Sequence, residues 1–170
     1  MAKTDFKPGT MIYPLPAVMV SCGETPEEYN ILTIAWTGTI CSDPPMCYIS
    51  VRPGRHSYEI LKRTGEFVIN LTTEELARAT DWCGCRSGRK FNKWEEMNLT
   101  PVPARKINAP VIAEAPVNIE CVVRQVIPLG THDMFISEVV HISAEEDYMD
   151  EKGAFSLARA KTGKSIAARI

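Results

Sequence analysis

The residues best suited to bind an anion lie in one short stretch, Ser50-Val-Arg-Pro-Gly-Arg-His-Ser57. Arg52 and Arg55 offer planar guanidinium groups whose paired N–H donors match the oxygens of a phosphate. Ser57 is expected to cap a short helix, whose free backbone N–H groups and positive dipole end also attract anions. The same spacing fits arginines that pair with surface carboxylates, so the stretch predicts an anion site without identifying the anion.

A second segment whose residues could contact a ligand, Asn30–Pro45, comes shortly before this stretch. Its Thr37-Gly-Thr39 sequence places two hydroxyls around a glycine, where the backbone can approach a ligand closely. A plain hairpin turn uses the same residue types. Trp36 fits either a wall of a ligand slot or a core aromatic. Lys93 lies in a basic segment that could close over a second anion.

The sequence lacks the common motifs that bind nucleotide phosphates and the common motif of serine hydrolases. The sequence has no Gly-x-Gly-x-x-Gly, no Gly-x-x-x-x-Gly-Lys-Ser/Thr and no Gly-x-Ser-x-Gly. A pairing of Cys41 with His56 as nucleophile and base is not marked by any local pattern, and a small buried thiol and a packing histidine are favoured instead. Cys83-Gly-Cys85 is one residue tighter than Cys-x-x-Cys, so no metal site is predicted.

Length and charge set the class of protein. A chain of 170 residues with 45% hydrophobic and 24% charged side chains is typical of one globular domain, here residues 1–170. A net charge of −2 argues against a dedicated nucleic-acid binder. No apolar run is long enough to span a bilayer, and the N-terminus lacks the apolar core of a signal peptide. We therefore expect a cytoplasmic protein with no membrane partner and six largely reduced cysteines.

The pattern along the chain predicts a mainly β protein with helical insertions. Alternating or compact apolar runs predict six strands: Val18–Cys22, Tyr29–Trp36, Met46–Val51, Phe67–Leu71, Val117–Ile127 and Met134–Ile142. Helices are expected at Tyr58–Lys62, from a capping box at Thr72 to Trp82, and at Phe91–Met97. The proline-punctuated stretch 101–116 is expected to run over the surface. A closed antiparallel barrel suits these strands because it leaves no exposed edges.

Taken in order, the motifs resemble the flavin reductase-like family of FMN-binding split barrels, and especially its flavoredoxin branch. The resemblance covers about residues 10–150. The segments that carry it are Asn30–Thr39, Ser42-Asp-Pro-Pro45, Ile49–Tyr58, Phe67–Leu71, Cys85-Arg-Ser-Gly88 with Lys93, Ala109–Glu114, Val117–Cys121 and Gly130–Val139.

The resemblance implies a six-stranded antiparallel split β-barrel that forms a homodimer with FMN at the subunit interface. Thr33, Ala35, Trp36, Thr37, Gly38 and Thr39 would face the flavin ring. Ser50, Arg52 and Ser57 would hold the phosphate, with Lys93 near the phosphate or ring. His132 lies in the Gly130–Asp133 turn, which would approach from the partner subunit.

The activity implied is that of an FMN oxidoreductase. It would take a hydride from NADH or NADPH and pass electrons to free flavin, ferric iron or a redox protein partner. An FMN electron carrier without a nicotinamide site, and a non-redox ligand-binding module on the same barrel, are the alternatives. The tail Lys161–Ile170 departs from the family, which often carries a tyrosine near a leucine-glycine pair there.

Overall fold

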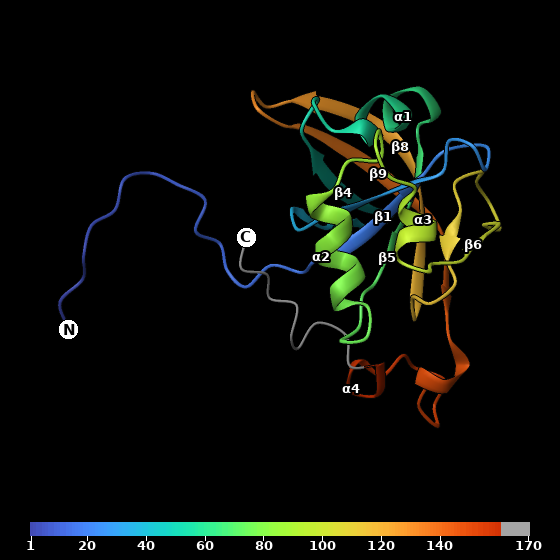
Figure 1. Cartoon of the computed structure of the whole chain (residues 1–170). Coiled ribbons are helices and arrows are strands. Elements are labelled where there is room, and N and C mark those ends of the chain that lie inside the picture. The colour runs from blue at the N-terminus through green and yellow to red at the C-terminus, as the bar shows by residue number, and fades with distance from the viewer. Residues whose placement is uncertain (161–170) are drawn as a thin grey trace.

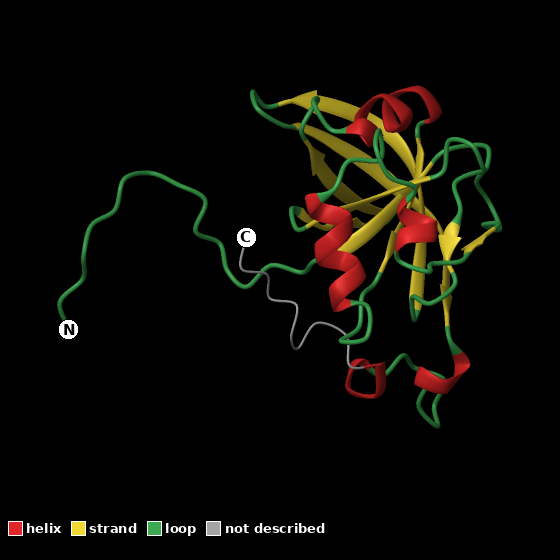
Figure 2. Cartoon of the chain, viewed as in Figure 1, coloured by secondary structure: helices red, strands yellow, loops and turns green. Residues whose placement is uncertain are grey.

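The computed structural model describes residues 1–160, so the tail Lys161–Ile170 lies outside the described residues. One antiparallel sheet dominates the molecule, with helices and loops packed around it (Figures 1 and 2). Its strands, in sheet order, are β2 (Asn30–Ile34), β1 (Val18–Cys22), β5 (Glu66–Asn70), β8 (Val117–Pro128), β9 (Asp133–Ala144), β4 (Pro45–Val51) and β3 (Thr37–Ser42). The remaining elements are α1 (His56–Thr64), α2 (Ala77–Cys85), α3 (Lys93–Glu96), β6 (Pro101–Val102), β7 (Val111–Ile112), the 3₁₀ turn η1 (Glu146–Tyr148) and α4 (Leu157–Ala160).

The sheet closes because its two ends are neighbours in sequence. β2 and β3 stand at opposite ends of the strand order, yet only Ala35 and Trp36 separate them along the chain. The backbone N–H of Ser50 donates to the carbonyl of Trp36 at 2.9 Å, which ties β4 to this link. The resulting barrel leaves few free strand edges, as the sequence pattern predicted.

Alternation along β1 explains why the strand is buried on both faces. Val18, Val20 and Cys22 join the cluster inside the barrel, whereas Met19 packs outward among residues of α2 and α3. A strand covered on both faces reads as a continuous apolar run. The barrel interior also holds two free thiols, Cys47 and Cys121, whose sulfur atoms lie 3.6 Å apart.

The stretch 101–116 does not simply run over the surface. It contributes buried side chains and is fixed by polar groups of the barrel. The side-chain oxygen of Asn70, which is fully buried, accepts from the backbone N–H of Ile112 at 3.0 Å and from Asn118 at 2.9 Å. The carboxylate of Glu120 accepts from the backbone N–H groups of Arg105 and Lys106. The stretch also forms one short regular element, because β6 and β7 pair with each other in an antiparallel ladder of two residues each. Outside this ladder, side chains supply the hydrogen bonds that fix its backbone.

The strand and helix boundaries correct several predictions. The main sheet has seven strands, because Thr37–Ser42 forms β3 where a turn and loop were expected. Helix α1 begins at His56 with Arg55 as its N-cap residue, so Ser57 is not the cap, although Gly65 does end the helix in a left-handed conformation. The capping box at Thr72 was wrong as well. Its hydroxyl donates to the carbonyl of Ala17, and α2 begins only at Ala77.

We expect Asn70→Ala to destabilise the protein by about 1–3 kcal/mol or more, because it leaves the N–H of Ile112 buried without an acceptor. Asn108→Ala is the matched control: Asn108 is exposed, and the change should cost no more than about 0.5 kcal/mol. Urea unfolding of the two variants measures the difference. Equal midpoints would contradict the anchoring role of Asn70.

Candidate functional site

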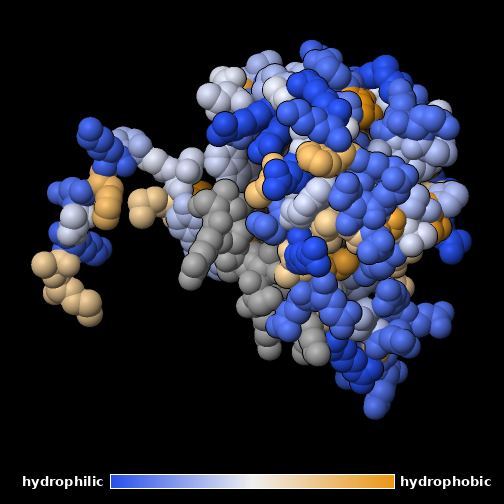
Figure 3. Space-filling model, viewed as in Figure 1, coloured by the Kyte–Doolittle hydropathy of each residue, from blue (hydrophilic) through white to orange (hydrophobic). Residues whose placement is uncertain are grey.

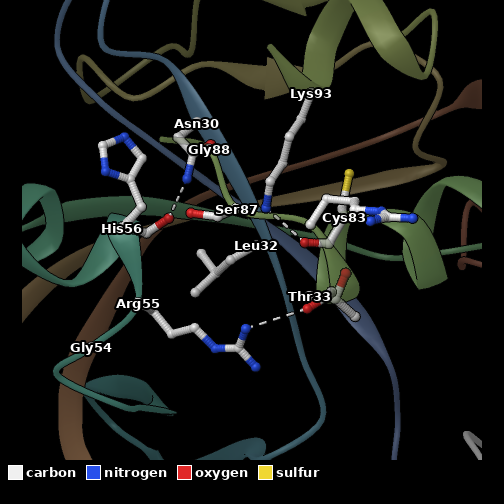
Figure 4. Close-up of a pocket in the computed structure, with 13 residues that line it drawn as sticks. Asn30, Leu32, Thr33, Gly54, Arg55, His56, Cys83, Ser87, Gly88 and Lys93 are labelled. Carbon is white, nitrogen blue, oxygen red and sulfur yellow. Dashed lines mark hydrogen bonds between the residues drawn. The ribbon is translucent and has the colours of Figure 1, made fainter. Parts of the chain in front are cut away.

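A cavity of about 140 Å³ opens where β2, the start of α1 and the end of α2 meet (Figure 4). Within residues 1–160, its wall contains several cationic or hydroxyl side chains and no carboxylate. The lining residues are Asn30, Leu32, Thr33, Gly54, Arg55, His56, Ser57, Cys83, Gly84, Arg86, Ser87, Gly88 and Lys93. We call this space the anion cavity, because positive charge and free hydrogen-bond donors converge on it.

Lys93 supplies the deepest of these charges. Its side chain is only 4% exposed, and its ammonium donates to the carbonyls of Ile31 at 2.6 Å and Cys83 at 2.7 Å. Among residues 1–160, no carboxylate lies within 4.0 Å of this ammonium. Burial lowers the pKa of Lys93, and the positive charge of Arg55 lowers it further. A buried cation that only carbonyls satisfy favours an anion beside it.

Asn30 and Ser57 form a fixed pair in the wall of the anion cavity. The amide of Asn30 donates to the hydroxyl of Ser57 at 2.6 Å, and both side chains are buried. This bond leaves the hydroxyl hydrogen of Ser57 free to point to another acceptor. Gly88 packs so closely here that a Cβ would lie 2.2 Å from Oδ1 of Asn30 and 2.8 Å from the ring of His56. The loop after α2 therefore reaches β2 only because residue 88 has no side chain.

The cations around the anion cavity repel one another. The pKa of His56 is lowered, first by burial and then by the charges of Arg89 and Lys93. Arg55 turns its guanidinium toward the end of α2, where it donates to the carbonyl of Gly84 at 3.4 Å. Helix α1 adds its positive end at Arg55–Ser57. A bound anion would relieve this repulsion.

Arg52, Trp36 and His132 form a separate cluster beyond the Arg52–Arg55 turn. Nε of Arg52 donates to Nε2 of His132 at 3.3 Å, and Thr131 contacts Nδ1 at 3.0 Å. The His132 and Trp36 rings have their centroids 4.5 Å apart. Burial and the charges of Arg52 and Arg55 lower the pKa of His132.

The predicted site residues thus fall into two groups. Thr33, Ser57 and Lys93 line the anion cavity, whereas Trp36 and Ser50 line a larger cavity of about 610 Å³ together with His132. Arg52, which sequence reasoning grouped with Ser57, is exposed and lines neither cavity.

Other predicted residues serve the barrel itself. Ala35 is buried in the link between β2 and β3, and the hydroxyl of Thr37 donates to the carbonyl of Tyr48 at 2.6 Å. Gly38 gives room to the Tyr48 ring, from which a Cβ would lie 3.3 Å away, and Thr39 is exposed. Cys41 is half-exposed rather than buried, and its thiol lies 3.4 Å from the carbonyl of Asp43.

Several residues that line the anion cavity were not predicted as site residues, and Asn30, Ser87 and Gly88 are the most informative of them. Asn30 was placed in the Tyr29–Trp36 strand and in the Asn30–Pro45 segment, but its own side chain was given no role. The sequence did contain an indication of its role, because Asn30 stands next to an apolar run. An amide that is buried in such a run needs a hydrogen-bond partner. The signal at Ser87-Gly88 was a loop of small residues between basic ones.

Comparison with known proteins identifies the family of the chain. The family model described as "Flavin reductase like domain" matches residues 10–160. The chain belongs to this flavin reductase-like family. An uncharacterized protein from Archaeoglobus fulgidus is 30% identical over 141 residues, covering 83% of this chain and 78% of the relative. The NADH-dependent flavin reductase StyB of Pseudomonas fluorescens is 27% identical over 138 residues, covering 80% and 75% of the two chains.

The solved flavoredoxin of Desulfovibrio vulgaris (Miyazaki F) is 28% identical with a TM-score of 0.87, and the match covers 94% of this chain and 85% of that one. The fold is the split β-barrel of this family. None of the helices within residues 1–160 has the length and apolar composition needed to cross a membrane. In the same range, no group of three or more His, Cys, Asp or Glu residues has the geometry of a metal site.

Substitution of Gly88 tests the cavity directly. We expect Gly88→Ala to displace Asn30 and His56 and to weaken binding of inorganic phosphate at least tenfold, because the added carbon overlaps Oδ1 of Asn30. Gly54→Ala is the control in the same wall, since a Cβ there meets no atom within 4 Å. Isothermal titration with phosphate measures both. Equal affinity in the two variants would contradict the assignment.

Proposed function

We propose that the protein is an FMN-dependent oxidoreductase whose anion cavity holds the phosphate of the cofactor. The buried ammonium of Lys93 carries this proposal, because its charge is met only by two carbonyls in the described residues. Arg55, Ser57 and the start of α1 supply further donors on the same side. These groups fit a phosphate, and membership of the flavin reductase-like family supports a flavin as its carrier.

In this proposal the flavin ring lies outside the anion cavity. A space of about 140 Å³ suits the phosphate end of FMN and is too small for a tricyclic ring as well. Thr33 at the cavity and Trp36 at the larger space lie on one run of chain, so the ring would extend along it toward Trp36 and His132. His132 is fixed by Arg52 and Thr131, which makes Arg52 a positioning residue in this proposal.

Bound flavin supplies the capacity to accept a hydride and to release electrons, and the protein orients it. The named relatives support two versions of this function. StyB is an NADH-dependent flavin reductase, which favours NADH as the donor and a flavin as the acceptor. The flavoredoxin match favours an electron carrier that receives electrons from, and passes them to, protein partners. The exposed Arg78, Arg86, Arg89 and Lys90 form a basic surface suited to acidic partners.

The same proposal includes a homodimer in which each subunit completes the site of the other. The larger cavity is open and is lined by Leu129, Thr131 and His132 from the turn between β8 and β9. Leu129 is 57% exposed at the tip of this turn. An exposed apolar side chain at a projecting tip suits contact with a second subunit.

Mixing the purified protein with NADH or NADPH in a stopped-flow instrument separates the two versions. A reductase bleaches its bound flavin at catalytic rates, whereas a carrier does so only through a partner enzyme. A protein that takes up no FMN in titration would contradict both and would support a non-redox binding module.

The two arginines should differ in what they recognise. Arg55→Ala should weaken FMN about tenfold to a hundredfold while changing riboflavin little, because it removes a charge-assisted contact to phosphate. Arg52→Ala should affect both flavins alike, since it releases His132 instead. Fluorescence titrations with the two flavins measure this. Phosphate selectivity lost only in the Arg52 variant would reverse the assignment.

The affinity for FMN should also depend on pH through Lys93. Burial holds the pKa of Lys93 below its ordinary value of 10.5. The group is cationic below that lowered pKa and neutral above it, so FMN should bind more weakly as the pH rises through it, and riboflavin should change less. Lys93→Met should abolish this difference between the flavins. A profile that is unchanged in the variant would exclude Lys93 as the phosphate partner.

A further inference from the structure

The first sixteen residues form an extended N-terminal arm that leaves the barrel (Figure 1). Hydrophobic side chains are strung along it, away from the body (Figure 3). Phe6, Met11, Ile12 and Tyr13 are 73%, 62%, 80% and 59% exposed. No residue of the arm makes a backbone hydrogen bond with another residue in the described part of the chain. Such a segment gains stability only when another surface covers it.

The larger cavity lies between this arm and the barrel. Gly9–Tyr13 and Leu15 form one wall. The barrel side comes from Trp36, from β4, from the turn between β8 and β9, and from the start of β9. Tyr48, Leu129 and Met134 make the barrel wall largely apolar. Among residues 1–160, His132 is the only acidic or basic side chain that lines the space, and burial lowers its pKa. Two apolar walls about a cavity of about 610 Å³ call for an apolar occupant.

The chain itself contains a segment with the properties of that occupant. From Pro8 to Cys22 the sequence carries no charged side chain, and its part 8–13 is both exposed and free of secondary structure. The same segment forms one wall of the cavity. In two copies related by a twofold axis, the arm of each copy can therefore occupy the cavity of the other. This self-complementarity is the defining property of an isologous interface. The free N–H and C=O groups of the arm add the capacity for strand-like pairing.

We infer that the cavity receives the arm of a second copy of this chain, so that residues 9–13 of each subunit lie between the arm and the barrel of the other. The exchange covers Met11, Ile12 and Tyr13 and closes the larger cavity over the flavin ring that the proposal above places beside Trp36 and His132. Each subunit thereby contributes residues to the ring side of the other subunit's flavin site. This inference rests on the homodimer proposed above and specifies the segment that forms it.

Photo-crosslinking decides whether the arm contacts its own barrel or that of another copy. Ile12→p-benzoylphenylalanine is produced in ¹⁴N and ¹⁵N forms, which are unfolded, mixed and refolded together before irradiation. Exchange predicts cross-links from residue 12 to the 129–134 region, with about half of the cross-linked pairs carrying both isotopes. Cross-links found only between peptides of the same isotope, or only to other regions, would overturn the inference.

A set of arm variants provides an independent measurement. Met11→Ser combined with Ile12→Ser should raise the dimer dissociation constant at least tenfold in sedimentation equilibrium, because it removes two exposed apolar side chains from the interface. Val102→Ser is the control, since Val102 is 39% exposed on β6, on the side of the barrel away from the arm. Equal dissociation constants for the double variant and the control would also overturn the inference.

These outcomes stay separate from the proposed function. FMN titration of the unmodified protein tests the cofactor, and its failure leaves the cross-linking result intact. A dimer that binds FMN but shows no mixed-isotope pairs refutes the exchange of arms alone. A monomer at all concentrations refutes both the exchange and the proposed homodimer.

Discussion

The buried ammonium of Lys93 is the interaction on which the site depends. Placing an unpaired cation in an interior costs several kcal/mol unless polar groups replace its water. Here two carbonyls do so, one from β2 and one from the last turn of α2. Lys93 itself begins α3, after Asn92 caps the helix. One charged group therefore joins three elements. Its third N–H donor remains available to an anion in the cavity.

The turn after β4 distributes the charges that surround this group. The N–H of Arg55 donates to the carbonyl of Arg52 at 3.0 Å, so the chain reverses between the two arginines. Arg55 then faces α2 and Arg52 faces His132. The hydroxyl of Tyr58, one turn into α1, donates to the carboxylate of Asp133 at 2.5 Å, which raises the pKa of Tyr58 to about 12. This bond holds the start of α1 against the strand that follows His132.

Much of the fold was predictable because it depends on local patterns. Strands β1, β4, β5, β8 and β9 followed from alternating or compact apolar runs, which report directly on which faces are buried. Strand β3 was missed because Thr37–Ser42 is only half-buried, so its residues carry no apolar alternation. The helix starts were misplaced because the hydroxyls of Thr72 and Ser57 make tertiary hydrogen bonds instead of capping a helix. The Thr72 hydroxyl donates to the carbonyl of Ala17, and the Ser57 hydroxyl accepts from the amide of Asn30. Competition of this kind is invisible in a sequence window.

The sequence by itself determined the chemistry that is available: arginines and a serine able to bind a phosphate, a lysine in a basic segment, and an order of motifs that identifies the flavin reductase-like family. Only the tertiary structure decided how these groups are shared between sites. Residues 52 and 55 are three apart, and a turn sends them to opposite sides. Residues 30, 57 and 93 are far apart in the chain, and barrel closure brings them to one cavity. Spacing along a chain fixes distance only within one helix or strand, whereas the anion cavity is made where several of them meet.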